Sequence, residues 1–175
     1  MEFNLERSME ILSRTPAVLE NMLAGLSPEW LYANEGENTW SPHAVMGHLV
    51  YAEESNWMAR VRKILSTKDN HFEGFNRLRQ FELYSDQDIK DLLAKFALLR
   101  KNSVSELSKM GLDKDTLSRV GVHPDFGNVT LSQLLSTWTV HDLDHINQIS
   151  RVMAKQYKDA VGPWSNYLGV IKRSI

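Results

Sequence analysis

Hydrophobic residues recur along this chain at three- and four-residue steps, which is the spacing of side chains on one face of an α-helix. The clearest pattern covers residues 86–110, where the stripe continues through the whole segment. Ser85 and Asp88 supply an N-cap and a first-turn carboxylate, and Gly111 is predicted to end the helix. The predicted inward stripe contains Ile89, Leu92, Leu93, Phe96, Leu99, Ser103, Val104, Leu107 and Met110.

A second helix is predicted from its first residues. Ser41 is a good capping residue, and Pro42 suits the first helical position because the N–H that proline lacks would have no helical partner there. We expect this helix to last until Leu65. Gly47 has no side chain and would let a neighbouring element approach closely. The predicted inward positions are Val45, His48, Leu49 and Ala52.

A third helix begins with the spacing of a capping box, Thr130 followed by Gln133. In this motif each side chain pairs with the backbone N–H of the other residue, so it marks a helix start. The helix is predicted to reach about Ala154. Its stripe contains Leu131, Leu134, Leu135, Trp138, His141, His145, Ile149 and Val152.

The N-terminal segment 4–24 also has a helical pattern. Pro16 is expected to kink or divide this helix, because proline removes one backbone hydrogen bond and crowds the preceding turn. Gly25 is predicted to end it, and a further short helix is predicted over 164–171. The apolar side of the first segment contains Leu5, Met9, Leu12, Leu19 and Leu23.

The segments between these helices, at about 25–40, 66–85 and 111–129, are longer than usual bundle connections. Each could run the length of a bundle helix and join parallel neighbours. Alternation of polar and apolar residues never persists over a strand length, so no strand is predicted. The pattern therefore predicts an all-α fold, a four-helix bundle with long crossover connections, in one domain over residues 1–175.

Composition excludes several classes of protein. Of the 175 residues 42% are hydrophobic and 24% are charged, which is typical of a globular protein. The net charge is −2 and no window concentrates Lys and Arg, so nucleic-acid binding is not expected. No apolar stretch approaches the ~20 residues of a membrane-spanning helix, and the N-terminus lacks the pattern of a secretory signal. We expect a cytoplasmic protein.

The chain contains no cysteine, so thiolate ligands and a cysteine nucleophile are excluded, and any metal must be bound by His, Asp or Glu. His141 and His145 lie four residues apart, which brings both imidazoles to one helix face within about 40° of each other. That face carries Trp138 and Ile149, so it should point to the bundle interior. Two buried imidazoles need partners, and a shared cation would be one.

His48 is the predicted third partner, because it lies between inward positions of the helix that begins after Ser41. Three neutral imidazoles from two helices form a ligand set expected of a catalytic site with open positions for water. The alternative is that each histidine is a core residue that hydrogen-bonds to a neighbour. Such a metal-free bundle would contain no stoichiometric metal, and changing His141→Ala would remove none.

The remaining histidines are given no role. His43, in the first turn of its helix, and His71, in a polar connection, are predicted to be solvated. His123 precedes a proline, and a structural role in a loop is predicted for it.

Two pairs of acidic residues lie close to the candidate ligands in the sequence. Asp142 and Asp144 flank the histidine pair at about 80° around the helix. Asp142 is predicted to be a surface charge, whereas Asp144 is a candidate for contact with a ligating histidine. Glu53 and Glu54 do not share the helix face of His48, so neither is expected to be a ligand.

Two segments, WSPHAVMGHL (40–49) and WTVHDLDHINQI (138–149), resemble the DinB-like, or YfiT-like, superfamily of metal-dependent enzymes. The resemblance covers nearly the whole chain, and its combination of motifs is more specific than the histidine spacing. The other segments that look like the family pattern are Arg14-Thr15-Pro16, Phe96-Ala97-Leu98-Leu99-Arg100, His123-Pro124 with Gly127, and Gly162-Pro163-Trp164.

The resemblance implies a four-helix bundle with a divalent metal ion, often zinc or nickel, commonly in a homodimer. It places the metal ligands at His48, His141 and His145. Characterised members include transferases that join low-molecular-weight thiols to electrophiles, and many others have only a hydrolase label. The substrate is not implied, because one fold can serve many chemistries.

The leading hypothesis is therefore an enzyme whose metal ion activates water or a small thiol for attack on a small electrophilic substrate, as a hydrolase or a thiol-dependent S-transferase. Any thiol must come from a co-substrate, because the chain has no cysteine. Three imidazoles do not distinguish zinc from nickel, copper or iron. The alternative hypothesis is a non-catalytic, metal-stabilised module that binds a small ligand or serves in a stress response.

Overall fold

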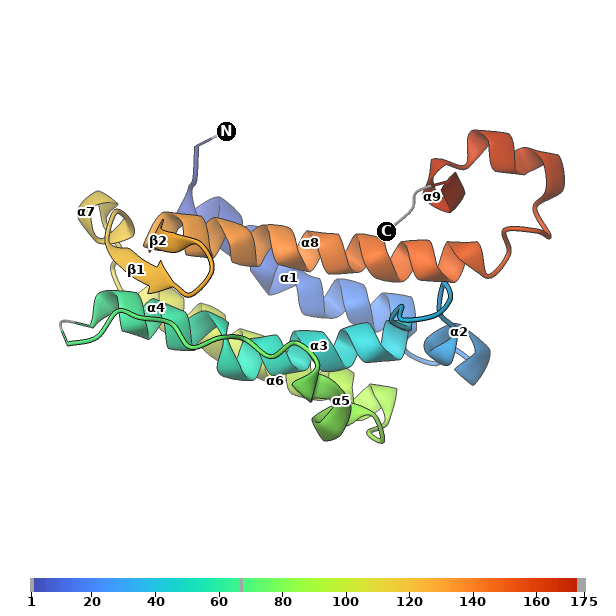
Figure 1. The fold of residues 1–175 in the computed structure, drawn as a ribbon, viewed down its shortest axis with the longest axis horizontal. Helices are drawn as coiled ribbons and strands as arrows, with labels where there is room; N and C mark the ends of the chain where they lie inside the picture. The colour runs from blue at the N-terminus through green and yellow to red at the C-terminus, as the bar shows by residue number, and fades with distance from the viewer. Residues whose placement is uncertain (1, 67, 173–175) are drawn as a thin grey trace.

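The computed structural model describes residues 2–66 and 68–172 and confirms the predicted four-helix bundle (Figure 1). The long helices are α1 (Leu5–Leu23), α3 (Pro42–Ser55) continued by α4 (Trp57–Leu65), α6 (Ile89–Lys109) and α8 (Leu131–Lys155). The shorter elements are α2 (Pro28–Tyr32), α5 (Arg79–Tyr84), α7 (Lys114–Leu117), β1 (Val120–His123), β2 (Gly127–Thr130), a 3₁₀-helix (Gly162–Tyr167) and α9 (Gly169–Lys172).

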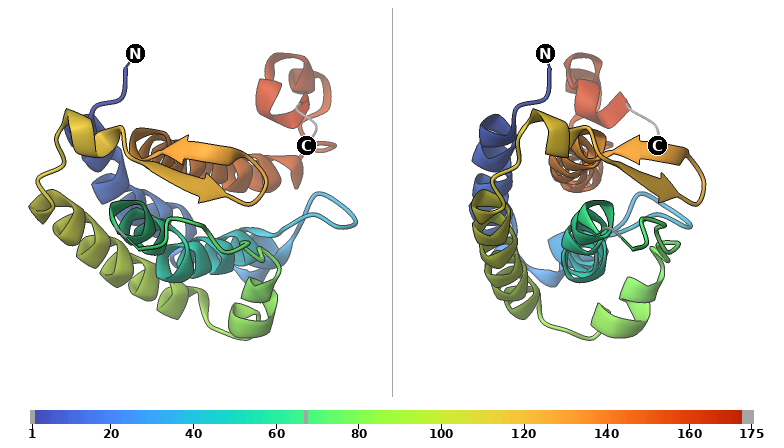
Figure 2. Two further views of the ribbon diagram at one scale, coloured as in Figure 1. Left: turned by 60° about the vertical axis from the view of Figure 1, so that its left-hand side comes forward. Right: turned by 90° about the vertical axis from the view of Figure 1, so that its left-hand side faces the viewer.

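The order of the long helices around the bundle differs from their order along the chain. Helix α1 packs against α6 and α8, and α3 packs against the same two helices from the other side (Figure 2). Helices α3, α4 and α6 run in one direction, whereas α1 and α8 run in the other (Figure 1). Residues 68–78 run back along the bundle to α5, so a long crossover connection joins the parallel neighbours α4 and α6, as its length allows.

Side-chain caps define where the long helices begin. Thr130 forms the predicted capping box, since its Oγ1 accepts from the N–H of Gln133 at 3.2 Å and its own N–H donates to Gln133 Oε1 at 2.8 Å. Ser41 Oγ accepts from the N–H of Ala44 at 3.2 Å. The cap of α6 is Asp88, which accepts from Lys90, so this helix begins three residues later than predicted.

Pro16 lies inside α1 without dividing it, contrary to one of the two outcomes expected. A proline at this position leaves the carbonyl of Leu12, four residues earlier, without its helical donor. Arg100 of α6 supplies the missing hydrogen bond, because its Nη1 donates to the carbonyl oxygen of Leu12 at 3.0 Å. The cost of the proline is thus offset by a contact between two helices.

The helix predicted to run from Pro42 to Leu65 is interrupted at Asn56, where the backbone has φ −108° and ψ −64°. The hydrogen-bond ladder continues on both sides, since the N–H of Asn56 donates to Ala52 and its carbonyl accepts from Arg60, each at 3.0 Å. The prediction of one uninterrupted helix was therefore wrong, and the two parts, α3 and α4, form one arm of the bundle. Asn56 itself is buried and faces the cavity described below.

The prediction that the chain forms no strand was wrong in one place, because β1 and β2 pair as an antiparallel hairpin from Val120↔Thr130 to His123↔Gly127. Each strand has only four residues, too few for an alternating pattern to stand out in the sequence. A Cβ atom at Gly121 would lie 2.7 Å from the Phe72 ring, so this glycine allows the hairpin to pack closely on the bundle. The hairpin leads directly into α8.

The remaining expectations concern the C-terminal part and Gly47. The helix predicted over 164–171 is instead a 3₁₀-helix followed by α9, with a break at Leu168. Gly47 does permit a close approach: a Cβ atom there would lie 2.6 Å from Gln80 Oε1 and 3.2 Å from Tyr84 Cβ of α5. Within the described part of the chain, no helix is long and apolar enough to cross a membrane.

Candidate metal centre

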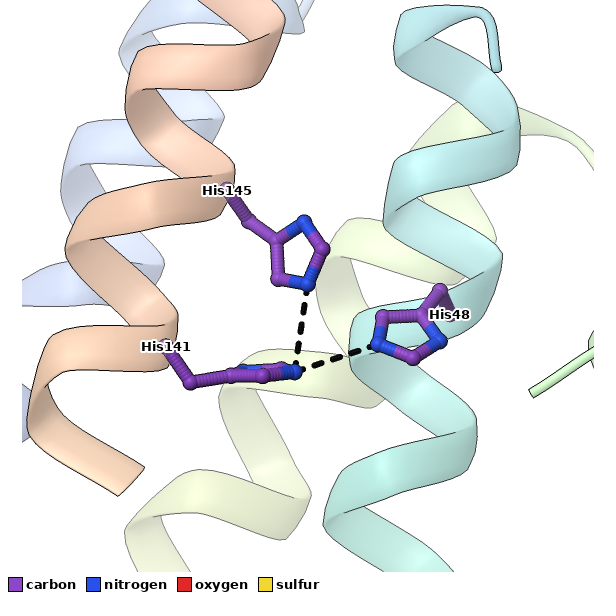
Figure 3. Close-up of side chains that lie close together, drawn as sticks. All are labelled: His48, His141 and His145. Atoms are coloured by element: carbon purple, nitrogen blue, oxygen red, sulfur yellow. Dashed lines mark hydrogen bonds between the residues drawn. The ribbon is translucent and has the colours of Figure 1, made fainter. Parts of the chain in front are cut away.

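His48 projects from α3, and His141 and His145 project toward it from α8 (Figure 3). Nε2 of His141 lies 3.1 Å from Nε2 of His48 and 3.1 Å from Nε2 of His145. One ligand nitrogen from each residue lies within 4.8 Å of the other two. Across residues 2–66 and 68–172, no carboxylate joins this group. The structure thus brings the three predicted ligands together, while metal binding itself stays a prediction.

The protonation states of the three rings favour a bound cation. His145 Nδ1 donates to Gln148 Oε1 at 2.8 Å, so Nε2 of the neutral His145 ring carries a lone pair. His141 Nε2 faces two nitrogens, and a single hydrogen on it can satisfy only one of those contacts. With three neutral rings, at least one of the two contacts therefore cannot be a hydrogen bond. A cation that accepts all three lone pairs removes this conflict.

The distances also fit a metal ion. Zinc binds imidazole nitrogen at about 2.0–2.1 Å, and tetrahedral geometry then places two nitrogen ligands about 3.3 Å apart. The two N···N distances of 3.1 Å at His141 are close to that value. The donor set and its spacing therefore fit a divalent transition metal.

Burial keeps all three imidazoles in the neutral form that binds metal. Desolvation lowers the pKa of His48 to about 3, with smaller contributions from the charges of His145 and Arg77. Desolvation likewise lowers the pKa of His141 to about 2 and, in part opposed by the hydrogen bond to Gln148, lowers that of His145. Near neutral pH no imidazolium therefore has to lose its proton before a cation binds.

Aromatic side chains enclose the three histidines. Trp57 stacks on Trp138 with ring centroids 5.6 Å apart, and its edge meets the His141 ring at 5.0 Å. Trp40 lies 5.1 Å from the His48 ring on the other side. These rings limit the rotamers open to the imidazoles and exclude water from one side of the site.

We expect Gln148→Ala to weaken metal binding about 10–100-fold, because the side chain holds His145 in the tautomer with a free Nε2 lone pair. In the described part of the chain, Nδ1 of His48 and His141 has no such acceptor, so Gln148 is the protein group that orients a ligand here. Zinc titration of the purified variant measures the effect. The matched control is Asn147→Ala, one residue earlier and outside the cavity; an equal loss in both variants would contradict the assignment.

A cavity of about 1030 Å³ opens onto the three histidines. Its walls come from α3, α4, α8, the connection at 38–40, and residues 75–78 with the start of α5. The non-histidine side chains that matter for its chemistry are Trp40, Phe75, Arg77, Phe81, Asp144 and Arg151. The volume is sufficient for a small organic substrate. Three of these six residues, Trp40, Phe75 and Arg77, lie in connections, where the hydrophobic pattern offered no signal.

The histidines that were given no role lie outside the metal centre. His71 is exposed as predicted. His43 is buried instead of solvated, because its Nε2 lies 2.7 Å from the carbonyl oxygen of Gln87 and its ring packs against Tyr32. His123 is the last residue of β1. Its Nδ1 accepts from the N–H of Asp125 at 3.1 Å and its ring stacks on Phe126, so its role is structural.

Asp142 is wrongly predicted as a surface charge, because it is fully buried and bound to Arg100. Arg100 also donates to Glu53 Oε2 at 3.0 and 3.1 Å, so one guanidinium holds two buried carboxylates from α3 and α8. The sequence did contain a signal, since each of the three residues lies on the inward stripe of its own helix. Charged residues at such positions indicate a buried ion pair.

Asp144 is exposed at the cavity and has no hydrogen bond to a histidine within the described residues. Its negative charge contributes toward a higher pKa for both His145 and Arg151. Contact of Asp144 with a ligating histidine stays a prediction.

Comparisons with known proteins agree with this fold. The family model of the DinB superfamily matches residues 11–149. A solved structure described as YfiT from Bacillus subtilis, a probable metal-dependent hydrolase with an unusual four-helix bundle topology, matches with a TM-score of 0.73 and 19% identity over 90% of this chain and 87% of that one. TT2238, described as a four-helix bundle protein, matches with a TM-score of 0.59 and 19% identity over 84% and 98% of the respective chains. No curated protein matches.

Proposed function

Because this chain belongs to the DinB superfamily, we propose that it is a metal-dependent enzyme whose divalent ion is bound by His48, His141 and His145. The observation that carries the proposal is the convergence of three neutral imidazoles, joined by two N···N contacts that protons alone do not satisfy. Zinc and nickel are the ions we expect from the family resemblance, and imidazole ligands suit both.

Two features favour a catalytic role for the ion over a structural one: the number of protein ligands and the cavity beside them. Structural zinc sites are usually closed by four protein ligands, whereas catalytic sites have three and an open position. The described residues supply three, and all three histidines line the cavity. A small substrate could therefore approach the ion from the cavity.

A divalent cation in this site would lower the pKa of a bound water or thiol and so supply a nucleophile near neutral pH. Other residues of the protein would position the ligands of this ion and shape its surroundings. Gln148 holds His145 in the ligating tautomer, while Trp40 and Trp57 limit the access of bulk water to the imidazoles. Asp144 places a negative charge close to His145 in the cavity.

We propose hydrolysis, or transfer of a low-molecular-weight thiol, on a small electrophilic substrate as the reaction. The absence of cysteine means that a thiol would have to enter as a co-substrate. The hydrolase reading is supported by the description of YfiT as a probable metal-dependent hydrolase, which is a statement about that protein. A homodimer is a further expectation, carried by the family resemblance alone.

The second candidate function is a non-catalytic module in which the ion fastens α3 to α8 and the cavity binds a small ligand. It is supported by the position of the three histidines, which link helices far apart in the sequence. In that case metal would stabilise the bundle without turnover.

Metal removal tests the proposed function. Untagged protein should contain about one divalent ion per chain by elemental analysis, and chelation should abolish turnover of activated esters, or of the electrophile 1-chloro-2,4-dinitrobenzene with added cysteine. Returning zinc or nickel should restore it. Turnover that survives complete removal of metal would contradict the enzyme proposal, and stoichiometric metal with no turnover across the panel would favour the non-catalytic module.

A further inference from the structure

Arg77 lines the same cavity as the three histidines. It lies two residues before α5, in the connection that runs back along the bundle, and its side chain is exposed to the cavity solvent. Across residues 2–66 and 68–172, no carboxylate lies within salt-bridge distance of its guanidinium. Arg77 therefore has hydrogen-bond donors available for a ligand.

The other charged groups around the cavity balance one another. Arg151 donates two hydrogen bonds of 2.8 Å to Glu35, and Lys155 lies 2.9 Å from the same carboxylate. Asp144 adds a second negative charge close to Arg151. On the α8 side two cations thus face two carboxylates, and Arg77 on the opposite wall is left as an uncompensated positive charge.

A positive charge in this position works against the binding of a cation. Arg77 and the three histidines line one cavity, so its charge lies in the same space as the metal centre. For a metal site alone, a neutral or acidic residue would be better placed, because like charges repel. An anion bound in the cavity would offset this repulsion.

Aromatic side chains form an apolar wall in the cavity that Arg77 and the three histidines line. The His48 ring lies 5.1 Å from the Trp40 ring and 5.8 Å from the Phe75 ring. Phe81 meets the edge of Trp40 at 5.8 Å and also faces the cavity. A ligand that lies on this wall would have its apolar part against three aromatic rings, with one end toward the histidines and the other toward Arg77.

We propose that Arg77 binds the carboxylate of a small organic acid whose apolar part packs against Trp40, Phe75 and Phe81 and whose reacting group faces the three histidines. The inference rests on the proposed function and narrows its substrate to amphipathic carboxylates. Arginine suits this role because its planar guanidinium can donate two parallel hydrogen bonds to one carboxylate.

The test compares 3-phenylpropanoate with its neutral amide, which has the same shape and no charge. Dissociation constants are measured by NMR titration at low salt, on both chelated and zinc-loaded protein. Wild-type protein should bind the acid about tenfold more tightly than the amide in both forms, as expected for a charge-assisted hydrogen bond. Arg77→Gln should remove this preference and leave binding of the amide unchanged.

The matched control is Arg79→Gln, which removes the same charge two residues away, at a side chain that pairs with Glu82 outside the cavity. This control should keep the tenfold preference. Equal loss in the two variants, or a preference for the acid that survives in Arg77→Gln, would overturn the inference. Zinc content, measured separately, should be the same in Arg77→Gln and wild type. A failure to bind metal would therefore count against the proposed function, whereas the chelated samples would still decide the role of Arg77.

Discussion

Replacing Arg100 with methionine will lower the free energy of unfolding by about 3–5 kcal/mol, because it leaves two buried carboxylates without their cation. Glu53 and Asp142 are inaccessible to solvent, and both depend on the Arg100 guanidinium for charge compensation. The same substitution removes the donor to the carbonyl of Leu12 that Pro16 leaves unpaired. Three helices of the bundle, α1, α3 and α8, thus lose the partner that α6 supplies to all of them.

Urea unfolding followed by circular dichroism measures this effect. The matched control is Arg62→Met, because Arg62 also makes a two-bond contact with a carboxylate, that of Glu106, but on the surface. Exposed pairs contribute about 0–1 kcal/mol, so the control should be nearly as stable as wild type. If the two arginine variants lost similar stability, the claim that burial makes the ion pairs of Arg100 more stabilising than a surface pair would be wrong.

A second expectation separates compensation of charge from packing. Changing Arg100, Glu53 and Asp142 together to apolar residues of similar size should recover much of the loss, since replacing a whole buried ion network is often neutral or stabilising. A triple variant less stable than Arg100→Met would show that the polar network itself is required for the fold.

The second large effect is expected from His48→Ala, which should weaken metal binding more than about 100-fold because one of three ligands is lost. At a zinc concentration 100 times the dissociation constant, binding stabilises the wild-type protein by about 2.7 kcal/mol. A variant with 100-fold weaker affinity would gain only about 0.4 kcal/mol under the same conditions. Thermal unfolding with and without zinc measures both gains.

His43→Ala is the matched control, because His43 lies five residues earlier on the same helix and is equally buried, but points to Gln87. It should be less stable than wild type without metal and still show the full zinc-induced gain. Full zinc stabilisation in His48→Ala would reject the ligand assignment, whereas loss of the gain in both variants would show that the effect follows damage to the helix.

Much of the bundle could be predicted because helix signals are local. The stripe of α6 and the capping box of α8 involve residues no more than four positions apart, so backbone geometry alone relates them. The pair His141 and His145 is of the same kind. The break at Asn56 and the short hairpin could not be found this way, since neither changes the pattern over more than a few residues.

The charged residues of the core show a different limit of prediction from sequence. Arg100 and Asp142 lie on inward stripes, but on one helix alone each would be a buried, unpaired charge, and the sequence pattern therefore favoured a surface position for Asp142. Only the packing of α6 between α1 and α3, diagonally opposite α8, brings the opposite charges together (Figure 2). A buried charge that has no partner on its own helix is thus compensated by an opposite charge on a helix far away in the sequence.

The sequence by itself determined the helical class of this protein, the starts of three long helices and the three histidines that could share an ion, because each follows from residue type and spacing along one helix. The tertiary structure decided which helices are neighbours, that His48 meets the pair on α8, and that Arg77 and an aromatic wall from the connections form a cavity over them. Those contacts join segments far apart in the chain, such as His48 and His145, which are 97 residues apart. They depend on how the helices pack and on no local pattern.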